Sequence, residues 1–326
     1  MDFLPDADQV ALMEATREYI DSRFPLVDAL ARLDDVRWKE IASLGWLGLA
    51  ADERSGGGGA TLLDEVFVFR EIGRGLVCGP ILTTLAAARL AAWTGRHDLA
   101  RSLIAGERRV SRALPLPGVA GRLLLLDADD SQLTLLVEHD RALLCPTPPF
   151  AEAHGGLEDG TLVAPVERSA FGDPLADAHD GVTTGRLRRV LTVLASAQLA
   201  GIAGATRDLA TAHAKDRIQF GKPIGAFQAI KHKCADMATN ALAADNVTYF
   251  AALSDSDYHA LSAAVNTRRA AFANARANIQ IHGAMGFTVE DGAHRFLKRA
   301  HTLSVTEGFD RAAKQLGGMP ETSEDA

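Results

Sequence analysis

The stretch that decides the fold is RIQFGKPIGAFQAIKH, residues 217–232, which joins two segments of helical periodicity. Pro223 cannot continue the first helix, because proline lacks the amide hydrogen, and Gly221 and Gly225 allow the backbone a tight turn. Arg217 then stands close to the N-terminus of the following helix, where free amide groups and a guanidinium together favour an anion. From these residues alone two interpretations stay open, an anion site or an ordinary loop with solvated charges.

Helical periodicity extends from this loop in both directions. Apolar residues recur at i, i+3, i+4 and i+7, and the three stripes are Leu187, Val190, Leu191 and Leu194, then Ile230, Cys234, Met237 and Ala241, then Tyr258, Leu261 and Val265. Gly201 and Gly204 are predicted to let a neighbouring helix approach closely. The apolar run at 190–205 contains small residues and has charged flanks, so we interpret it as a buried bundle helix rather than a membrane span.

The first third of the chain is also expected to be helical. Acidic residues precede its first amphipathic run, and a glycine loop at 57–59 separates two later helices. The helix after that loop is predicted to end near Gly73 and Gly75, since glycine commonly terminates helices.

The middle of the chain contains short apolar runs that are typical of strands, namely Leu123–Leu126, Leu133–Val137 and Ala142–Cys145. The polar segment Asp127–Ser131 suggests a hairpin between the first two runs. We therefore predict a mainly α protein with a small β domain. Its expected parts are an N-terminal helical domain (1–108), a reduced middle β domain (109–182), a C-terminal four-helix bundle (183–316) and a disordered tail (317–326).

Composition excludes several classes of protein. With 326 residues, of which 47% are hydrophobic and 23% charged, the chain can form two or three cores. The net charge of −8 argues against a nucleic-acid partner. Cys78, Cys145 and Cys234 lack metal-ligand spacing, so we expect a reduced protein without a metal. The N-terminus lacks the pattern of a signal peptide, and we expect a cytoplasmic protein that does not bind membranes.

Two further segments could carry chemistry. In QIHGAMGF, residues 280–287, a helix is expected to end in glycines whose backbone amides could approach a ligand closely, although a plain helix end followed by a turn explains the pattern as well. In Thr306-Glu307-Gly308, the carboxylate follows apolar residues and could be a buried base. It could equally be a surface glutamate at a helix end.

Taken together, these segments resemble the acyl-CoA dehydrogenase family. The matching patterns are Arg-x-Gln-Phe-Gly-x-Pro-Ile-x-x-Phe-Gln-x-x-x-His from Arg217 and Gln-x-x-Gly-x-x-Gly from Gln280, with Trp46-Leu-Gly-Leu and Glu71-Ile-Gly-Arg74 in the N-terminal part. The resemblance implies the family fold, a bound FAD at a subunit interface and a CoA thioester as substrate.

The resemblance also implies roles for particular residues. By this match, the residues that bind the diphosphate and adenine end of a neighbouring subunit's FAD are Arg217, Gln219, Phe220, Gln228, Gln280, Gly283 and Gly286. The family reaction needs a carboxylate base for the α-proton, and Glu307-Gly308 matches the Glu-Gly pair that many members use. Glu307 is therefore the predicted catalytic residue.

The sequence departs from the family in three places. Ala284 replaces a glycine beside Gly283, and Phe309 stands where a threonine usually follows the Glu-Gly pair. In the middle zone, RALPLPG at 112–118 replaces the segments with which full-length members hold the flavin ring. A chain that keeps the FAD-contacting motifs and has these departures resembles the short subunits of bacterial hetero-oligomeric acyl-CoA dehydrogenases. Some of those enzymes act on steroid-derived thioesters.

Three functions follow as hypotheses. The first is a subunit of an FAD-dependent acyl-CoA dehydrogenase that is active with a full-length partner subunit, in an α2β2-like complex or else as a homo-oligomer. The second is a non-catalytic paralogue that stabilises such a partner. The third is a helical interaction module without any flavin.

Overall fold

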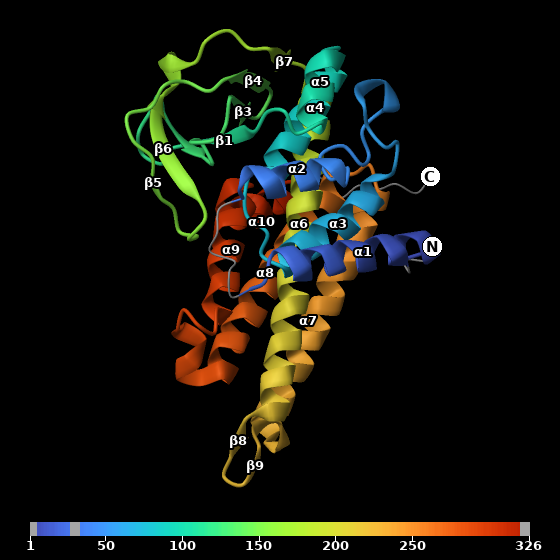
Figure 1. The fold of residues 1–326 in the computed structure, drawn as a ribbon, viewed down its shortest axis with the longest axis vertical. Coiled ribbons are helices and arrows are strands. Elements are labelled where there is room, and N and C mark those ends of the chain that lie inside the picture. Colours follow the sequence, from blue (N-terminus) through green and yellow to red (C-terminus); the bar gives the residue numbers. More distant parts are fainter. Residues whose placement is uncertain (1–4, 27–32, 320–326) are drawn as a thin grey trace.

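The computed structural model describes residues 5–26 and 33–319 (Figure 1). Along the sequence, one group of helices precedes the main β-sheet and a second group follows it. The N-terminal helices are α1 (Ala7–Arg23), α2 (Asp35–Ser43), η1 (Glu53–Ser55), α3 (Leu62–Arg74), α4 (Ile81–Trp93) and α5 (His97–Ile104). The C-terminal helices are α6 (Gly181–Asp216), η3 (Ile224–Ala226), α7 (Gln228–Leu253), α8 (Asp257–His282), η4 (Gly283–Phe287), α9 (Ala293–Thr306) and α10 (Phe309–Gly317). The mainly helical fold with a middle sheet, expected from the sequence, is confirmed.

The sheet contains seven strands in the order β5-β6-β2-β1-β3-β4-β7. Their bounds are β1 (Val110–Pro115), β2 (Arg122–Leu126), β3 (Leu133–Val137), β4 (Ala142–Pro146), β5 (His154–Gly155), β6 (Leu162–Glu167) and β7 (Ala176–Ala178), with η2 (Arg168–Ala170) after β6. The three apolar runs identified in the sequence are thus strands β2, β3 and β4.

The predicted hairpin between β2 and β3 is wrong. Strand β1 lies between them, antiparallel to β2 and parallel to β3. Strand β2 pairs with one edge of β1 as the next antiparallel strand along the chain, and β3 pairs with the other edge in parallel, so the polar segment Asp127–Ser131 crosses over instead of turning back. The described hairpins in this region join β1 to β2 and β3 to β4, and in the second the Glu138 amide donates to the Arg141 carbonyl at 2.8 Å.

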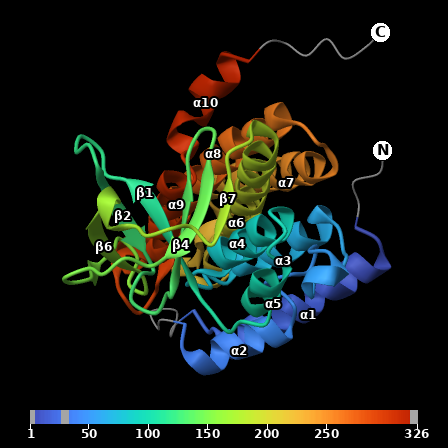
Figure 2. The ribbon, with the colours of Figure 1, turned by 90° about the horizontal axis from the view of Figure 1, so that it is seen from above.

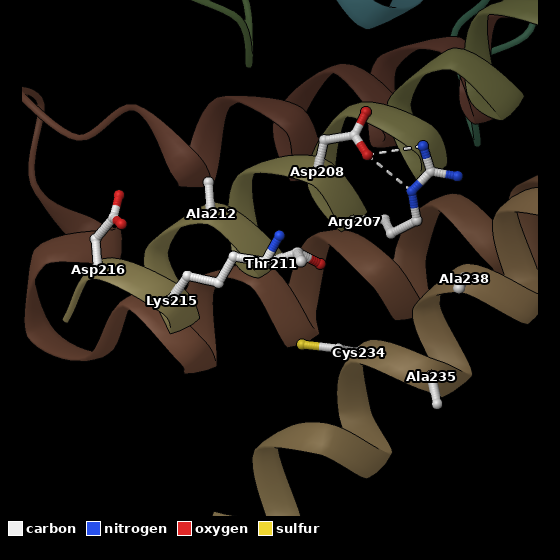
Figure 3. A pocket seen from close by; sticks show the side chains of 9 residues that line it. All are labelled: Arg207, Asp208, Thr211, Ala212, Lys215, Asp216, Cys234, Ala235 and Ala238. Atoms are coloured by element: carbon white, nitrogen blue, oxygen red, sulfur yellow. Dashed lines mark hydrogen bonds and ion pairs between the residues drawn. The ribbon is translucent and has the colours of Figure 1, made fainter. Parts of the chain in front are cut away.

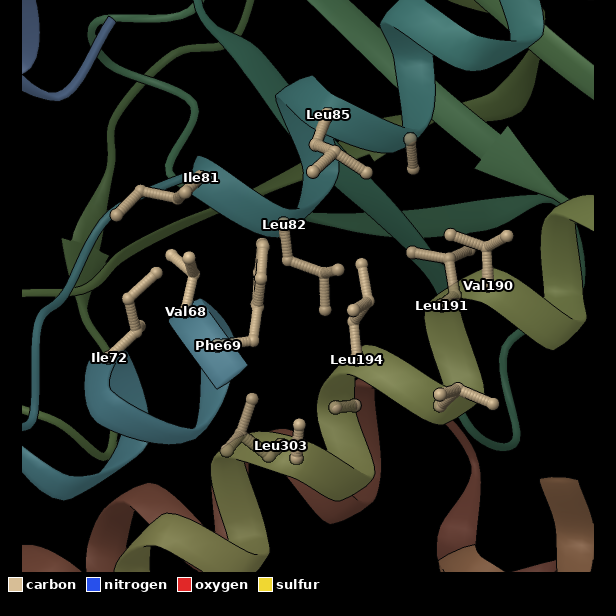
Figure 4. Close-up of a cluster of buried hydrophobic side chains, with 14 of the residues drawn as sticks. Val68, Phe69, Ile72, Ile81, Leu82, Leu85, Val190, Leu191, Leu194 and Leu303 are labelled. Atoms are coloured by element: carbon tan, nitrogen blue, oxygen red, sulfur yellow. The ribbon is translucent and has the colours of Figure 1, made fainter. Parts of the chain in front are cut away.

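The sheet packs against the helical part chiefly through α4, as the view from above shows (Figure 2). Apolar side chains of α3, α4, α6 and α9 form the core there, and the labelled ones are Val68, Phe69, Ile72, Ile81, Leu82, Leu85, Val190, Leu191, Leu194 and Leu303 (Figure 4). The helix after the glycine loop ends as predicted, since Gly75 caps α3.

Helix α6 is the central helix of the C-terminal part. Its N-terminus is capped by Asp180, whose side chain accepts a hydrogen bond from the Thr183 amide at 2.6 Å. It is the one described helix that is long and apolar enough to cross a membrane, and 89% of its apolar window is buried inside the protein. The sequence-based interpretation of 190–205 as a buried bundle helix is therefore confirmed.

Helices α6, α7 and α8 pack on one another, and α9 lies along α8 and α6. The far end of α6 and the start of α7 are joined by a small hairpin, β8 (Ile218–Gln219) and β9 (Lys222–Pro223), which projects from the end of the bundle opposite the sheet (Figure 1). Gly317 belongs to α10, and residues 320–326 of the predicted tail lie outside the described part.

Gly201 is where α3 and α6 approach most tightly, as its sequence context predicted. A Cβ atom at Gly201 would lie 1.9 Å from the carbonyl oxygen of Arg70, which no side-chain adjustment can relieve. At Gly204 the nearest atom would be the flexible end of Arg70 at 3.5 Å, an ordinary contact. Only the first of the two predicted glycines is therefore required by packing.

We expect Gly201→Ala to lower the free energy of unfolding by at least about 1–3 kcal/mol, because the two helices must separate. Gly185→Ala on the same helix is the matched control, since nothing lies within 4 Å of its added Cβ. Alanine there should raise stability by about 0.5–1 kcal/mol through helix propensity. Urea unfolding of both variants measures the difference, and equal effects would contradict the assigned contact.

Candidate active site

Glu307 lies at the end of α9, where the chain reverses into α10. Its amide donates to the Leu303 carbonyl at 3.0 Å and closes the last turn, and Gly308 follows with a φ of 70°. Glycine adopts this left-handed backbone conformation without strain, so the Glu-Gly pair makes a tight corner between two helices. The Glu307 side chain is only 6% exposed, which excludes the alternative of a surface glutamate.

Arg112 is the charged partner of Glu307. It stands on β1, and its Nη2 lies 3.4 Å from Oε2 of Glu307, with only 8% of the arginine side chain exposed. Burial raises the pKa of Glu307, and the positive charge of Arg112 opposes that shift without cancelling it. The carboxyl group is therefore easier to protonate than an ordinary glutamate.

Sequence reasoning did not identify Arg112. The sequence feature that could have identified Arg112 is a charged residue inside a short, mostly apolar run, residues 110–115. Such a residue is buried only when something pairs with it, because an uncompensated charge is costly to bury. The pairing partner is too distant in the sequence to be identified from pattern alone.

A second buried pair fixes α9 relative to the sheet. Nη1 of Arg299 lies 3.1 Å from Oε2 of Glu158, which stands between β5 and β6. Nη2 of the same arginine donates to the Val77 carbonyl and to Oε1 of Gln198 on α6, each at 3.1 Å. One guanidinium thus ties together α9, α6, the β5–β6 connection and the chain after α3. This tie determines where Glu307, at the end of α9, is held.

The segment from Arg217 folds as the β8–β9 hairpin. Phe220 and Gly221 occupy its turn with φ values of 54° and 77°, and the Ile224 amide closes it by donating to the Arg217 carbonyl at 2.8 Å. Phe220 is 92% exposed, so this turn holds an aromatic ring out of the protein. Positive φ is uncommon for a residue other than glycine, and the ring meets Phe227 in a T-shaped contact with centroids 6.1 Å apart.

The polar residues predicted around this hairpin are also accessible. Arg217, Gln219 and Gln228 are exposed. The Gln219 side chain donates to the carbonyl of Ile218 at 2.8 Å, and Gln228 contacts His232 at 3.3 Å. Both amides therefore make only local contacts that a ligand can replace.

The segment from Gln280 ends α8 and continues as η4. Gly283 has a φ of 67°, and a Cβ at Gly286 would lie 2.7 Å from the Ile279 carbonyl oxygen, so both positions require glycine. Ala284 is not among the residues with positive φ, and its replacement of a family glycine therefore costs little. Gln280 is exposed on α8.

The fold brings the Arg217 and Gln280 segments together at one end of the bundle. The ring of His213, one turn before Arg217, stacks on His282, which follows Gln280, with centroids 4.2 Å apart. Burial, followed by the neighbouring His282, lowers the pKa of His213, which favours the neutral form of its ring. Apolar contacts among α6, α7 and α8 lie beneath the two rings. We name the two segments, 217–228 and 280–287, the bundle-end surface.

Glu307 does not belong to the bundle-end surface. Gln198 of α6 is hydrogen bonded to Arg299, and Arg217 lies about 30 Å farther along α6 at about 1.5 Å per residue. Helix α9 runs the opposite way, so Glu307 is about two turns more distant still, beside the sheet. The predicted base and the predicted FAD-contacting residues thus lie at opposite ends of the C-terminal helical bundle.

An open groove of about 640 Å³ runs between α6 and α7 next to the bundle-end surface (Figure 3). Its lining residues are Arg207, Asp208, Thr211, Ala212, Lys215, Asp216, Cys234, Ala235 and Ala238. Arg207 and Asp208 form an ion pair at 2.7 Å, so part of the charge is already compensated. The groove contains none of the predicted site residues. Across residues 5–26 and 33–319, no group of His, Cys, Asp or Glu side chains could hold a metal ion.

Comparisons with known proteins agree with this architecture. Residues 6–97 match the N-terminal domain of acyl-CoA dehydrogenases, and residues 188–316 match the C-terminal domain. Acyl-CoA dehydrogenase IpdE2 of Mycobacterium tuberculosis is 30% identical over 275 residues, covering 82% of this chain and 81% of IpdE2. Acyl-CoA dehydrogenase FadE34 of the same organism is 32% identical over 289 residues, which cover 81% of this chain but only 39% of FadE34.

Solved structures show the same fold. A chain of the ChsE4–ChsE5 complex from Mycobacterium tuberculosis superposes with a TM-score of 0.85 at 21% identity, covering 98% of this chain and 100% of the other. A chain of the Tcur3481–Tcur3483 steroid ACAD superposes with a TM-score of 0.79 at 21% identity, covering 95% and 96%. By both domain matches and by its likeness to IpdE2, this chain belongs to the acyl-CoA dehydrogenase family.

Proposed function

We propose that this chain is a subunit of an FAD-dependent acyl-CoA dehydrogenase that removes the α- and β-hydrogens of a CoA thioester. Glu307 is the base that takes the α-proton, and the bundle-end surface holds the ADP part of FAD. The observation that carries the proposal is a buried carboxylate with a raised pKa, placed at a Glu-Gly corner beside the sheet. A base of this kind operates closer to neutral pH than an exposed glutamate does.

The residues of the bundle-end surface fit the diphosphate end of FAD. Arg217 is exposed and forms no ion pair with any residue in the described part of the chain, so its guanidinium is free for an anion. Phe220 holds its ring in solvent, where it can contact a flat group such as adenine. When bound, FAD supplies the acceptor for the hydride that leaves the β-carbon. The chain itself supplies binding, orientation and the proton acceptor.

The separation of the two regions supports a shared site between subunits. Because Glu307 and Arg217 lie at opposite ends of the bundle, we propose that Arg217 serves a flavin held mainly by another chain. Two solved structures with this fold are described by paired names, ChsE4–ChsE5 and Tcur3481–Tcur3483, and this supports a second, different chain as the partner subunit. We propose that this partner is a full-length acyl-CoA dehydrogenase. For the acyl group we propose a steroid-derived one, since the second structure is described as a steroid ACAD.

The test is co-expression with a full-length acyl-CoA dehydrogenase. We expect the chain purified alone to carry little flavin and the complex to be yellow. In the complex, Arg217→Gln should weaken FAD retention by about 10- to 100-fold, since a hydrogen bond to a charged group contributes about 1.5–3 kcal/mol. Dialysis followed by flavin absorbance measures the retained fraction.

Arg207→Gln is the matched control, because Arg207 lies on the same helix but already pairs with Asp208. It should leave FAD retention unchanged. A chain that binds one FAD per subunit as a homo-oligomer would refute the requirement for a different partner. Equal flavin loss in both variants would refute the role of Arg217.

A further inference from the structure

Arg112 is unusual among the buried arginines of this protein. Its Nε and Nη1 both lack a hydrogen-bond partner among the described residues, although the residue is 7% exposed. Within residues 5–26 and 33–319, five other arginines have an unpaired buried nitrogen, and each of them leaves only Nε unpaired: Arg89, Arg188, Arg268, Arg295 and Arg299. Arg112 therefore has the largest unsatisfied donor capacity of any buried arginine in the described part of the chain.

The one side-chain partner of Arg112 in the described part of the chain, Glu307, does not satisfy its guanidinium. The contact from Nη2 to Oε2 of Glu307 is 3.4 Å, which is longer than a charge-assisted hydrogen bond of about 2.7–2.9 Å. Buried donors are almost always paired, because desolvation without a hydrogen bond is costly. An arginine in this condition beside a carboxylate indicates that an oxygen acceptor from outside the chain completes the arrangement.

We propose that Arg112 donates a free N–H group to the carbonyl oxygen of the acyl thioester whose α-proton Glu307 removes. This inference rests on the proposed function and adds a second catalytic residue to it. For proton transfer, the α-carbon must approach the Glu307 carboxylate to about 3–3.5 Å. The thioester oxygen is two bonds from that carbon, and Arg112 contacts the same carboxylate, so one acyl group can reach both side chains.

The chemistry balances with these two residues and an oxidised flavin. The α C–H bond breaks, and its proton passes to Glu307. Its electron pair forms the α,β double bond while the β-hydrogen leaves with its own pair as hydride to the flavin. Negative charge gathers on the thioester oxygen during proton removal. A guanidinium already fixed there stabilises this charge without any reorganisation of solvent. Arg112 thus makes the α-proton more acidic, and its charge opposes the rise in the pKa of Glu307 that burial causes.

The first test observes the bound thioester without turnover. The complex carrying Glu307→Gln is loaded with the acyl-CoA that the wild-type complex oxidises, labelled with ¹³C at the thioester carbon. We expect a downfield shift of the carbonyl resonance relative to free thioester, and its loss in the double variant Glu307→Gln/Arg112→Gln. The Glu307→Gln background also removes the buried carboxylate that Arg112→Gln alone would leave unpaired, so folding is preserved. An unchanged shift in the double variant would overturn the proposal.

The second test is kinetic. In the otherwise wild-type complex, Arg112→Gln should lower kcat by about 10²–10³-fold, as loss of an oxyanion donor does. Because the charge of Arg112 lowers the pKa of Glu307, the acid limb of the kcat/KM profile should move to higher pH. Arg112→Lys should restore part of kcat and return the acid limb, since the charge is kept.

Arg89→Gln is the control for a buried arginine, because Arg89 pairs with Glu65 inside the N-terminal helices. It should move neither the acid limb nor the carbonyl resonance. If Glu307→Gln oxidised the thioester at the wild-type rate, the proposed function of Glu307 would fail instead. A structural role for Arg112 alone predicts lower stability without a change in the pH profile, and that outcome would refute the inference.

Discussion

Replacing Glu307 with glutamine in the flavin-loaded complex is expected to lower the rate of thioester oxidation by about 10²–10⁴-fold, the usual contribution of a general base. Glutamine keeps the shape of the side chain and cannot accept the proton. Stopped-flow measurement of flavin reduction by the acyl-CoA isolates this step from reoxidation. In the unmodified complex, kcat/KM should fall as the pH drops through the raised pKa of Glu307, above the ordinary value of about 4.3.

Two controls make this result interpretable. Flavin content should match the unmodified complex, since Glu307 is remote from the bundle-end surface. Glu290→Gln, in the exposed turn before α9, changes charge in the same way without touching the buried pair and should keep full activity. Undiminished flavin reduction by Glu307→Gln would assign the base to the partner subunit and favour the hypothesis of a non-catalytic paralogue.

Replacing Arg299 with leucine is expected to lower the free energy of unfolding by about 3–5 kcal/mol. The change leaves the carboxylate of Glu158 buried without its charge partner, which is among the most destabilising single events in a protein interior. It also removes the hydrogen bonds to Val77 and Gln198 that join α9 to its neighbours. Urea unfolding measures the loss, and fluorescence and circular dichroism should report it equally.

Lys298→Leu is the matched control at the adjacent position. Lys298 pairs with Asp159 at 3.2 Å, but both side chains are about a third or more exposed, so this ion pair contributes about 0–1 kcal/mol. The double variant Arg299→Leu/Glu158→Leu should recover part of the lost stability, because no charge is then buried alone. A small effect of Arg299→Leu alone would show that water reaches the Glu158 carboxylate.

The helices were predictable because their signals are local. Apolar spacing of 3.6 residues located α6, α7 and α8, and glycine at the end of α3 marked its stop. The strands β2, β3 and β4 were also predictable as short apolar runs, but their pairing was not. Strand β1 pairs with β2 on one edge and with β3 on the other, one antiparallel and one parallel. Pairing depends on contacts between distant residues, which apolar runs alone do not encode.

For the candidate site, the sequence predicted which residues carry chemistry within each short motif. Arg217 with Phe220, Gln280 with Gly283, and Glu307 with Gly308 were all identified because each motif is contiguous. The tertiary structure alone decided that the first two motifs share one end of the bundle, that Glu307 lies at the other end, and that Arg112 meets it across the fold. The physical reason is that burial and pairing of a charge depend on packing between elements, whereas a motif depends only on neighbours along the chain.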